Sequence, residues 1–459
     1  MSFLRRRPPT PFTAISTSSW KWWGRDRGRE PRRPPEGVDP PWAVRVGESD
    51  VSGREATRPW ACVVAWPGPR IAIVDAVADF RVVIVGAGIA GVEGLLRLRR
   101  LAGEAVTVTL LSPEEHLVYR PSRVLEPFAH GQPPTRYPVA RIAADANTRW
   151  VRDSLSWLDT AARTVHTTSG QELPYDALLL ALGGHERKPN SDVVVFTDHT
   201  SEHLYREIMQ NIESGVMTSL ALVEPAGPSW PLPLYELAML TAKQARDADA
   251  HPQIAVVTTD PRPLDAFGGE VSDAVTSLLT EAGITLYTGS HARVRGPRRL
   301  RLEPTGIELE PDRIVTLPTI SGPNVRGLTG GADDRFIEVD EYCRARNAGG
   351  RIFAAGDATD LRVKQGGLAA QQADTAAAGI AHLAGVAPPP ARLRAVMQGA
   401  LLTGGKPLYL TAYLIAGSGV RSEIHDQPPW ASTQAIVAEE LTAYLATVQP
   451  TPTLSLEGE

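Results

Sequence analysis

Gly86, Gly88 and Gly91 have the type and spacing needed to hold the phosphates of a dinucleotide. They lie in the run RVVIVGAGIAGVEGLLR (residues 81–97), where four β-branched residues precede the glycines and an apolar helical pattern follows them. In such a turn the first glycine permits a sharp bend, the second leaves space for the phosphates, and the third lets helix and strand pack closely. The phosphates then accept hydrogen bonds from backbone N–H groups at the positive end of the helix. A glycine turn with a purely structural role is the alternative.

The next predicted strand, residues 105–111, should position the ribose of the same dinucleotide. In dinucleotide-binding units an acidic residue at the end of this strand accepts the ribose hydroxyls. Here Ser112 stands at the strand end, and Glu114 and Glu115 come just beyond it. Either glutamate could bind the ribose, or both are solvated loop charges. We include Glu115 among the cofactor-binding candidates.

A second α/β unit is predicted from near Val193, with strands over residues 219–225 and 253–260 and a helix over residues 233–245. The loop before that helix reads PAGPSWPLPLYE, where a second glycine-rich turn would be expected. Proline cannot donate an N–H and the Trp230 ring is large, so this loop should not cradle phosphates as the first one does. Binding of NAD(P)H is therefore doubtful.

The composition fits a globular chain and excludes several kinds of site. Apolar residues make up 42% and charged residues 22% of the 459 residues. The net charge of −5 argues against a nucleic-acid partner. Two cysteines, Cys62 and Cys343, are too few for a disulfide scaffold or a zinc cluster, so no metal is expected. No apolar run reaches the roughly 18 residues of a membrane span.

Residues 1–79 are rich in arginine, proline and tryptophan and show little periodicity. We interpret them as a disordered extension, or as the product of a start codon placed too far upstream. Trp20, Trp22 and Trp23 beside Lys21 leave open a contact with a membrane surface. The expected location is cytoplasmic, with peripheral membrane contact left open.

Two further motifs agree with the first. YDALLLALGG (residues 175–184) reads as a buried strand that ends in glycines, and RIFAAGDATD (residues 351–360) reads as a strand followed by Gly356 and Asp357. In order and spacing, over about residues 80–385, the three motifs resemble the flavoprotein pyridine nucleotide–disulfide oxidoreductase superfamily. The resemblance implies that the first motif binds the FAD pyrophosphate and that Asp357 lies at the ribityl and phosphate end of FAD.

Within that superfamily the chain looks most like sulfide:quinone oxidoreductases and type II NADH:quinone dehydrogenases. PAGPSWPLPLYELA is similar to the proline-rich loop of the former, and KQGGLAAQQADTAA (residues 364–377) to the helix start on the quinone side in both groups. Trp230 replaces the redox cysteine of sulfide:quinone oxidoreductases, and we interpret Cys343 as structural. Sulfide oxidation would then lack its thiol nucleophile.

The resemblance implies two Rossmann-like, doubly wound α/β domains and a small C-terminal α+β region. We predict an extension (residues 1–79), an FAD-binding domain in two parts (80–190 and 319–386), a second, NAD(P)-like domain (191–318) and a C-terminal region (387–459). That last region should hold two strands joined at residues 404–406 and a helix over residues 431–448.

The implied activity is transfer of electrons from a small donor through FAD to a quinone-like acceptor, without catalytic cysteines. The alternatives are an NAD(P)H-dependent reductase or dehydrogenase and a flavin-bound module without activity; the oligomeric state stays open. The catalytic candidates are Lys364, Gln365, Glu236 and Trp230. Lys364 could instead be an exposed loop lysine, and Glu236 could instead cap or ion-pair its helix. The cofactor-binding candidates are Gly86, Gly88, Ile89, Ala90, Gly91, Glu115, Arg120, Val151, Leu182, Gly183, Gly356 and Asp357.

Overall fold

A five-stranded parallel sheet built around β1 (Phe80–Val85) positions the glycine turn. The computed structural model describes residues 80–120, 123–128, 134–188, 192–197, 201–328, 335–415, 419–430, 436–448 and 450. The strand order is β20–β9–β1–β2–β5, formed by β20 (Ile352–Ala354), β9 (Ala177–Leu180), β2 (Val106–Leu111) and β5 (Arg149–Val151). Residues 82–85 are buried, as the run of β-branched residues predicts. Predictions for residues 1–79, including Cys62 and the tryptophans, lie outside the described residues.

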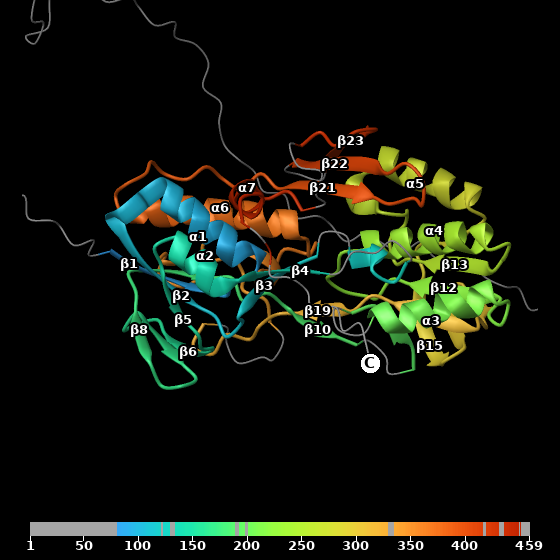
Figure 1. Cartoon of the computed structure of the whole chain (residues 1–459), viewed down its shortest axis with the longest axis horizontal. Coiled ribbons are helices and arrows are strands. Elements are labelled where there is room, and N and C mark those ends of the chain that lie inside the picture. Colours follow the sequence, from blue (N-terminus) through green and yellow to red (C-terminus); the bar gives the residue numbers. More distant parts are fainter. Residues whose placement is uncertain are drawn as a thin grey trace, which may run out of the picture. The chain divides into compact units, whose positions relative to one another are not determined.

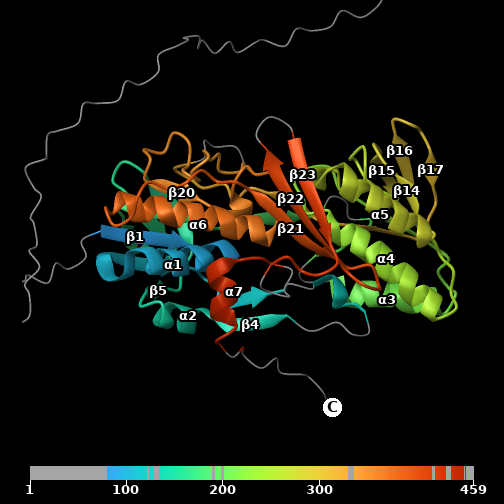
Figure 2. The same ribbon diagram turned by 90° about the horizontal axis from the view of Figure 1, so that it is seen from above.

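Helices α1 (Ile89–Ala102) and α6 (Gly366–Leu383) pack against each other beside this sheet (Figure 1, Figure 2). Small residues allow the close approach of the two helices. A Cβ at Gly94 would lie 2.7 Å from the Leu179 side chain and 3.5 Å from Cβ of Ala373. The alanine-rich sequence of α6 therefore lets α1 and α6 pack closely together against the same buried sheet.

A second parallel sheet has the order β11–β18–β12–β13–β14. Its strands are β11 (Val194–Val195), β18 (Arg313–Thr316), β12 (Ser219–Val223), β13 (Gln253–Val257) and β14 (Thr285–Tyr287). Helices α3 (Ser201–Glu213), α4 (Leu232–Asp247) and α5 (Gly269–Glu281) belong to this unit. The two parallel sheets confirm the predicted Rossmann-like architecture, whereas the exact domain boundaries stay a prediction.

Smaller antiparallel elements decorate the two sheets. They are β3 (His116–Tyr119) with β4 (Thr135–Pro138), β6 (Leu155–Asp159) with β7 (Thr164–Thr167) and β8 (Glu172–Pro174), β10 (His185–Arg187) with β19 (Thr319–Ser321), and β15 (His291–Gly296) with β16 (Arg299–Glu303) and β17 (Glu308–Leu309). Helix α2 (Val139–Asp145) follows β4. Because β10 and β19 pair across the two segments that join the sheets, these connections support each other.

The C-terminal region differs from the sequence-based prediction in two ways. The two predicted strands are β21 (Val396–Leu401) and β22 (Leu408–Ile415), but a third, β23 (Gly419–His425), completes the sheet. The helix predicted over residues 431–448 is wrong in extent, because within the described part of this range, residues 436–448, only α7 (Glu439–Leu445) is α-helical. Residues 436–438 precede α7 without regular structure and pack on the start of α6.

Two glycines bring backbone into contact with backbone at the turn after β1. Gly86 has a φ of +106°, and a Cβ there would lie 2.1 Å from the carbonyl oxygen of Ala181. A Cβ at Gly91 would lie 1.9 Å from the carbonyl oxygen of Gly86. Gly88 is different, because a Cβ there would meet no atom of the described residues within 4 Å. The three glycines thus serve a bend, an open space and a close helix–strand contact, as their spacing predicts.

We expect Gly91→Ala to lower the free energy of unfolding by about 3 kcal/mol or more, because the new methyl group must displace backbone rather than a side chain. Gly88→Ala is the matched control in the same turn, since its methyl group enters open space. Chemical denaturation of both variants measures the difference. Equal stabilities would contradict the contact between Gly91 and the carbonyl of Gly86.

Candidate functional site

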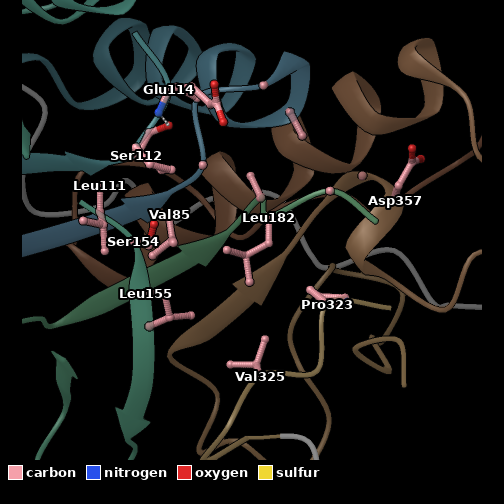
Figure 3. Close-up of a pocket in the computed structure, with 18 of the residues that line it drawn as sticks. Val85, Leu111, Ser112, Glu114, Ser154, Leu155, Leu182, Pro323, Val325 and Asp357 are labelled. Carbon is pink, nitrogen blue, oxygen red and sulfur yellow. Dashed lines mark hydrogen bonds between the residues drawn. The ribbon is translucent and has the colours of Figure 1, made fainter. Parts of the chain in front are cut away.

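A pocket of about 690 Å³ opens where β1, β2, β9 and β20 end. Ligands of doubly wound sheets bind at this carboxyl edge. Figure 3 shows side chains from these separate segments around the pocket, with Glu114 and Asp357 on opposite sides. The predicted residues that line it are Gly86, Gly88, Ile89, Ala90, Leu182, Gly183, Gly356 and Asp357. The sheet topology therefore brings the three sequence motifs to one place.

The start of α1 forms one wall of this large pocket. Gly88 is the N-cap residue, with an extended backbone and no side-chain cap, and the first turn of α1 contains no acidic residue. The positive end of the helix dipole therefore has no carboxylate of its own first turn to offset it. With Gly88 offering open space in place of a side chain, these residues fit a pyrophosphate group.

Asp357 reaches the opposite wall from a short 3₁₀ turn, Gly356–Ala358. Gly356 has a φ of +77°, and its N–H donates to Oε1 of Gln372 in α6 at 2.8 Å. The Thr359 hydroxyl donates to the carbonyl oxygen of Gly356 at 2.9 Å. These buried hydrogen bonds fix the turn, and with it the backbone from which Asp357 projects.

Four predicted cofactor-binding residues lie elsewhere. Glu115 forms an ion pair with Arg152 at 2.5 Å, and it is Glu114 that lines the large pocket. Arg120 lines a different cavity and forms an ion pair with Glu126 at 3.3 Å. Val151 is buried in the apolar core, and Gly91 acts through packing. Both glutamates lie in the irregular turn between β2 and β3, so the path of this turn decides which of them faces the large pocket.

Part of the lining of the large pocket was not predicted from the sequence. Asp153, Ser154 and Leu155 follow β5, and residues 323–326 approach from the segment after β19. The Ser169 hydroxyl donates to Asp153, and this and neighbouring hydrogen bonds hold the pKa of Asp153 well below its usual range. The position of residues 153–155 just after a parallel strand was the available signal.

A second cavity, of about 270 Å³, adjoins the large pocket, and Gly366 lines both. All four predicted catalytic residues line this second cavity: Trp230, Glu236, Lys364 and Gln365. Apolar and aromatic groups also line it, among them Leu232, Tyr409 and Ile436, together with Arg120 and Arg123. The arrangement can hold a flat, mainly apolar molecule next to the Asp357 end of the large pocket.

Lys364 is buried, with 6% of its surface exposed, so the alternative of an exposed loop lysine is wrong. Its Nζ donates to the carbonyl oxygen of Thr359 at 2.6 Å and to that of Asp357 at 3.3 Å, and it lies 3.8 Å from the centre of the Phe336 ring. Burial lowers the pKa of Lys364 to about 8, although Asp357 and Asp360 oppose this shift. Near neutral pH this group can therefore hold or release a proton.

Glu236 lies in α4, has 5% of its surface exposed, and accepts a hydrogen bond from the N–H of Leu402 at 3.1 Å. Burial raises its pKa to about 8. The alternative that Glu236 forms a cap or an ion pair within its own helix does not fit a carboxyl whose hydrogen bond reaches across to the C-terminal sheet. At pH 7 the group is mostly protonated.

The proline-rich loop before α4 is tied to the segment that carries Lys364. The carbonyl oxygen of Ser229 accepts from the N–H of Lys364, and that of Pro228 from the N–H of Ile320, both at 3.3 Å. Trp230 packs against Phe267, with 5.8 Å between ring centres. The loop thus forms a wall of the second cavity, and Pro231 is the N-cap of α4.

The second sheet has a pocket of about 300 Å³ at the end of β12. Glu224 follows β12 directly, as Gly86 follows β1, and it is buried with 8% of its surface exposed. Its carboxylate accepts from the Thr258 hydroxyl. Burial raises the pKa of Glu224, and its side chain stands where a glycine turn would leave space for phosphates.

Cys343 is completely buried, and burial raises the pKa of its thiol to about 12. A thiol with such a pKa is not a nucleophile near neutral pH. Cys343 therefore has a structural environment, as the sequence indicates. The described residues contain no group of three or more His, Cys, Asp or Glu arranged to hold a metal ion, and none of their helices is long and apolar enough to cross a membrane.

Comparison with known proteins agrees with this geometry. The family model described as pyridine nucleotide-disulphide oxidoreductase matches residues 80–216 and 235–377, more than half of the chain. An NADH dehydrogenase-like protein of Mycobacterium tuberculosis is 26% identical over 298 residues, which cover 62% of this chain and 74% of that protein. The sulfide-quinone reductase of Aquifex aeolicus is 22% identical over 272 residues, 54% of this chain and 60% of that protein.

The crystal structure of the sulfide:quinone oxidoreductase of Aquifex aeolicus has the same fold, with a TM-score of 0.66 and 17% identity over 76% of this chain and 87% of that one. A putidaredoxin reductase complexed with putidaredoxin gives a TM-score of 0.53 with 20% identity, over 73% and 82% of the two chains. The chain belongs to the pyridine nucleotide-disulphide oxidoreductase family and is an FAD-dependent oxidoreductase.

Proposed function

We propose that this flavoenzyme passes electrons from a small donor through FAD in the large pocket to a quinone-like acceptor in the second cavity, without a catalytic thiol. The observation that carries the proposal is that the two pockets share Gly366, with Lys364 and Glu236 on the acceptor side. FAD supplies the redox chemistry. The chain positions the flavin and the acceptor, supplies proton donors, and selects which donor and acceptor bind.

In this proposal the pyrophosphate of FAD lies at Gly88 and the first turn of α1, and Glu114 accepts the ribose hydroxyls. The fit of open space at Gly88 with the positive helix end supports the first assignment. Asp357 lies at the ribityl end, next to the shared wall at Gly366. Lys364, which donates to the carbonyl oxygen of Asp357, then brings positive charge close to that end of the cofactor.

Gly88→Trp should abolish FAD retention, because the indole would fill the space of the pyrophosphate. Since a Cβ at Gly88 meets no atom within 4 Å in the part of the chain that the structure describes, the fold should survive the substitution. Absorbance of the purified variant near the flavin bands, together with circular dichroism, separates cofactor loss from unfolding. A folded variant with normal flavin content would place FAD outside this turn.

The acceptor side fits a quinone because its reduction consumes two protons as well as two electrons. Glu236, mostly protonated at pH 7, can donate from Oε2 while Oε1 accepts the Leu402 N–H. Lys364 holds a second proton at Nζ, with a pKa of about 8. Trp230 offers a flat apolar wall for a planar ring.

The end of β12 in the second sheet, where a pyridine dinucleotide donor would be expected to bind, disfavours such a ligand. Glu224 stands where a phosphate-binding glycine would be expected, and Pro228, Pro231 and Pro233 provide no backbone donors. We expect NADH to bind with a dissociation constant in the high-micromolar range or weaker, roughly −5 kcal/mol. The relatives named for NADH or sulfide therefore do not fix the donor of this chain.

Anaerobic stopped-flow measurements test the proposal in both half-reactions. NADH, NADPH and sulfide are mixed in turn with the oxidised protein, and menadione with the dithionite-reduced protein. Reoxidation by menadione should be fast and saturable, and reduction by NADH should not saturate in the low-micromolar range. No reoxidation by menadione would favour a flavin-bound module without this activity. Tight saturation by NADH would favour an NAD(P)H-dependent dehydrogenase.

Glu236→Gln should slow reoxidation by menadione at pH 7 about tenfold to a hundredfold, because the amide cannot donate a proton that it can regain. In the unmodified protein the rate should fall as pH rises through about 8, where Glu236 and Lys364 lose their protons. In the Glu236→Gln variant, only the part of this pH dependence that is due to Lys364 should remain. Glu224→Gln removes another buried carboxyl and should leave this rate within about twofold. Equal pH profiles in all three proteins would exclude Glu236 as a proton donor.

A further inference from the structure

Helix α7 is held by a carboxylate that lies inside the protein. Glu93, in α1, has no exposed surface. Its Oε1 accepts from the N–H of Glu440 at 3.0 Å and its Oε2 from the N–H of Leu441 at 2.5 Å. Both N–H groups belong to the first turn of α7, where a helix has no partners of its own for them. Glu93 thus caps a helix that is more than 300 residues away in the sequence.

A seven-residue helix has little stability alone, so its position depends on these tertiary contacts. Leu441 and Leu445 are buried in the same apolar cluster as α1 and α6. On the outer side Arg100 forms ion pairs with Glu440 at 2.5 Å and with Glu439 at 3.2 Å. Apolar side chains alone would have served to bury the helix. The two hydrogen bonds to Glu93 also fix the position of α7 along the helix axis.

The residues just before α7 lie at the junction of the two pockets. A Cβ at Gly366, the residue shared by both pockets, would lie 3.2 Å from Cγ2 of Ile436. A Cβ at Gly367 would lie 3.4 Å from the carbonyl oxygen of Val437. Ile436 also lines the second cavity. Any shift of α7 must therefore move an apolar wall of that cavity.

We propose that Glu93 is a positioning residue that, through α7, holds Ile436 against Gly366 and so sets how tightly the acceptor binds in the second cavity. The effect on the acceptor rests on the function proposed above, whereas the effect on Ile436 rests on geometry alone. Glutamine in place of Glu93 keeps the volume but offers one accepting oxygen. Its NH₂ group would face a backbone N–H, and one buried donor would lose its partner.

The test compares Glu93→Gln, Ile436→Ala and the double variant in the full-length flavoprotein. The dithionite-reduced protein is reoxidised by menadione, which must enter the cavity, and by ferricyanide, which serves as a polar reference. Each single variant should raise the half-saturating menadione concentration about tenfold and leave the ferricyanide rate within about twofold. The double variant should resemble Ile436→Ala, because two residues that act through one contact are not additive.

Glu440→Gln is the matched control, since it removes the ion pairs with Arg97 and Arg100 but keeps the backbone N–H that Glu93 accepts. It should behave as the unmodified protein. A Glu93→Gln effect equal to that of Glu440→Gln, or fully additive with Ile436→Ala, would overturn the proposal. If Glu93→Gln does not fold, Leu441→Ala loosens α7 from its apolar side and must produce the same selective change with menadione.

Two measurements remain decisive even if menadione does not react with the unmodified protein, which would refute the proposed function alone. Hydrogen exchange of the amides in residues 439–445 should be faster in Glu93→Gln, and iodide should quench the flavin fluorescence more strongly. Unchanged exchange and quenching would refute the positioning role of Glu93 independently of any acceptor.

Discussion

The contact between Gly91 and the carbonyl oxygen of Gly86 determines where α1 begins relative to the sheet. A side chain at Gly91 would push the helix away from β1, and the first turn of α1 would no longer border the large pocket. The rest of the site follows from this placement. Helix α6 packs on α1, so the segment at its start, with Lys364 and Gln365, is located by the same contact. One backbone contact therefore aligns the large pocket with the second cavity.

The two Rossmann-like units have the same architecture but different groups at equivalent positions. After β1 a glycine and an uncapped helix start favour an anionic group, whereas after β12 a buried carboxylate and a proline-rich loop disfavour one. The loop of the second unit is instead bonded through its carbonyl oxygens to the segments around Ile320 and Lys364. The second unit thus contributes a wall to the second cavity.

Much of this arrangement can be predicted from sequence because the strongest signals are local. The β-branched run before Gly86, the glycines after Ala181 and the Gly356–Asp357 turn each specify a strand and the turn after it, and parallel pairing brings the turns together. Local signals could not decide whether Glu114 or Glu115 lines the large pocket, since the orientation of both side chains depends on how the chain leaves β2. The burial of Lys364 and Glu236 depends on contacts with residues 336 and 402, which no local pattern reveals.

The place of β20 in the first sheet has a consequence for how the protein is made. Synthesis runs from the N-terminus, and β1, β2, β5 and β9 are all complete once Leu180 has emerged. The edge beside β9 stays unpaired until Ile352–Ala354 follows, after the whole second sheet has been synthesised. The Asp357 wall of the large pocket arrives with that strand. Contacts so distant in sequence form slowly. A nascent chain therefore carries an exposed strand edge while residues 181–351 are synthesised, and the large pocket is completed only after the second sheet.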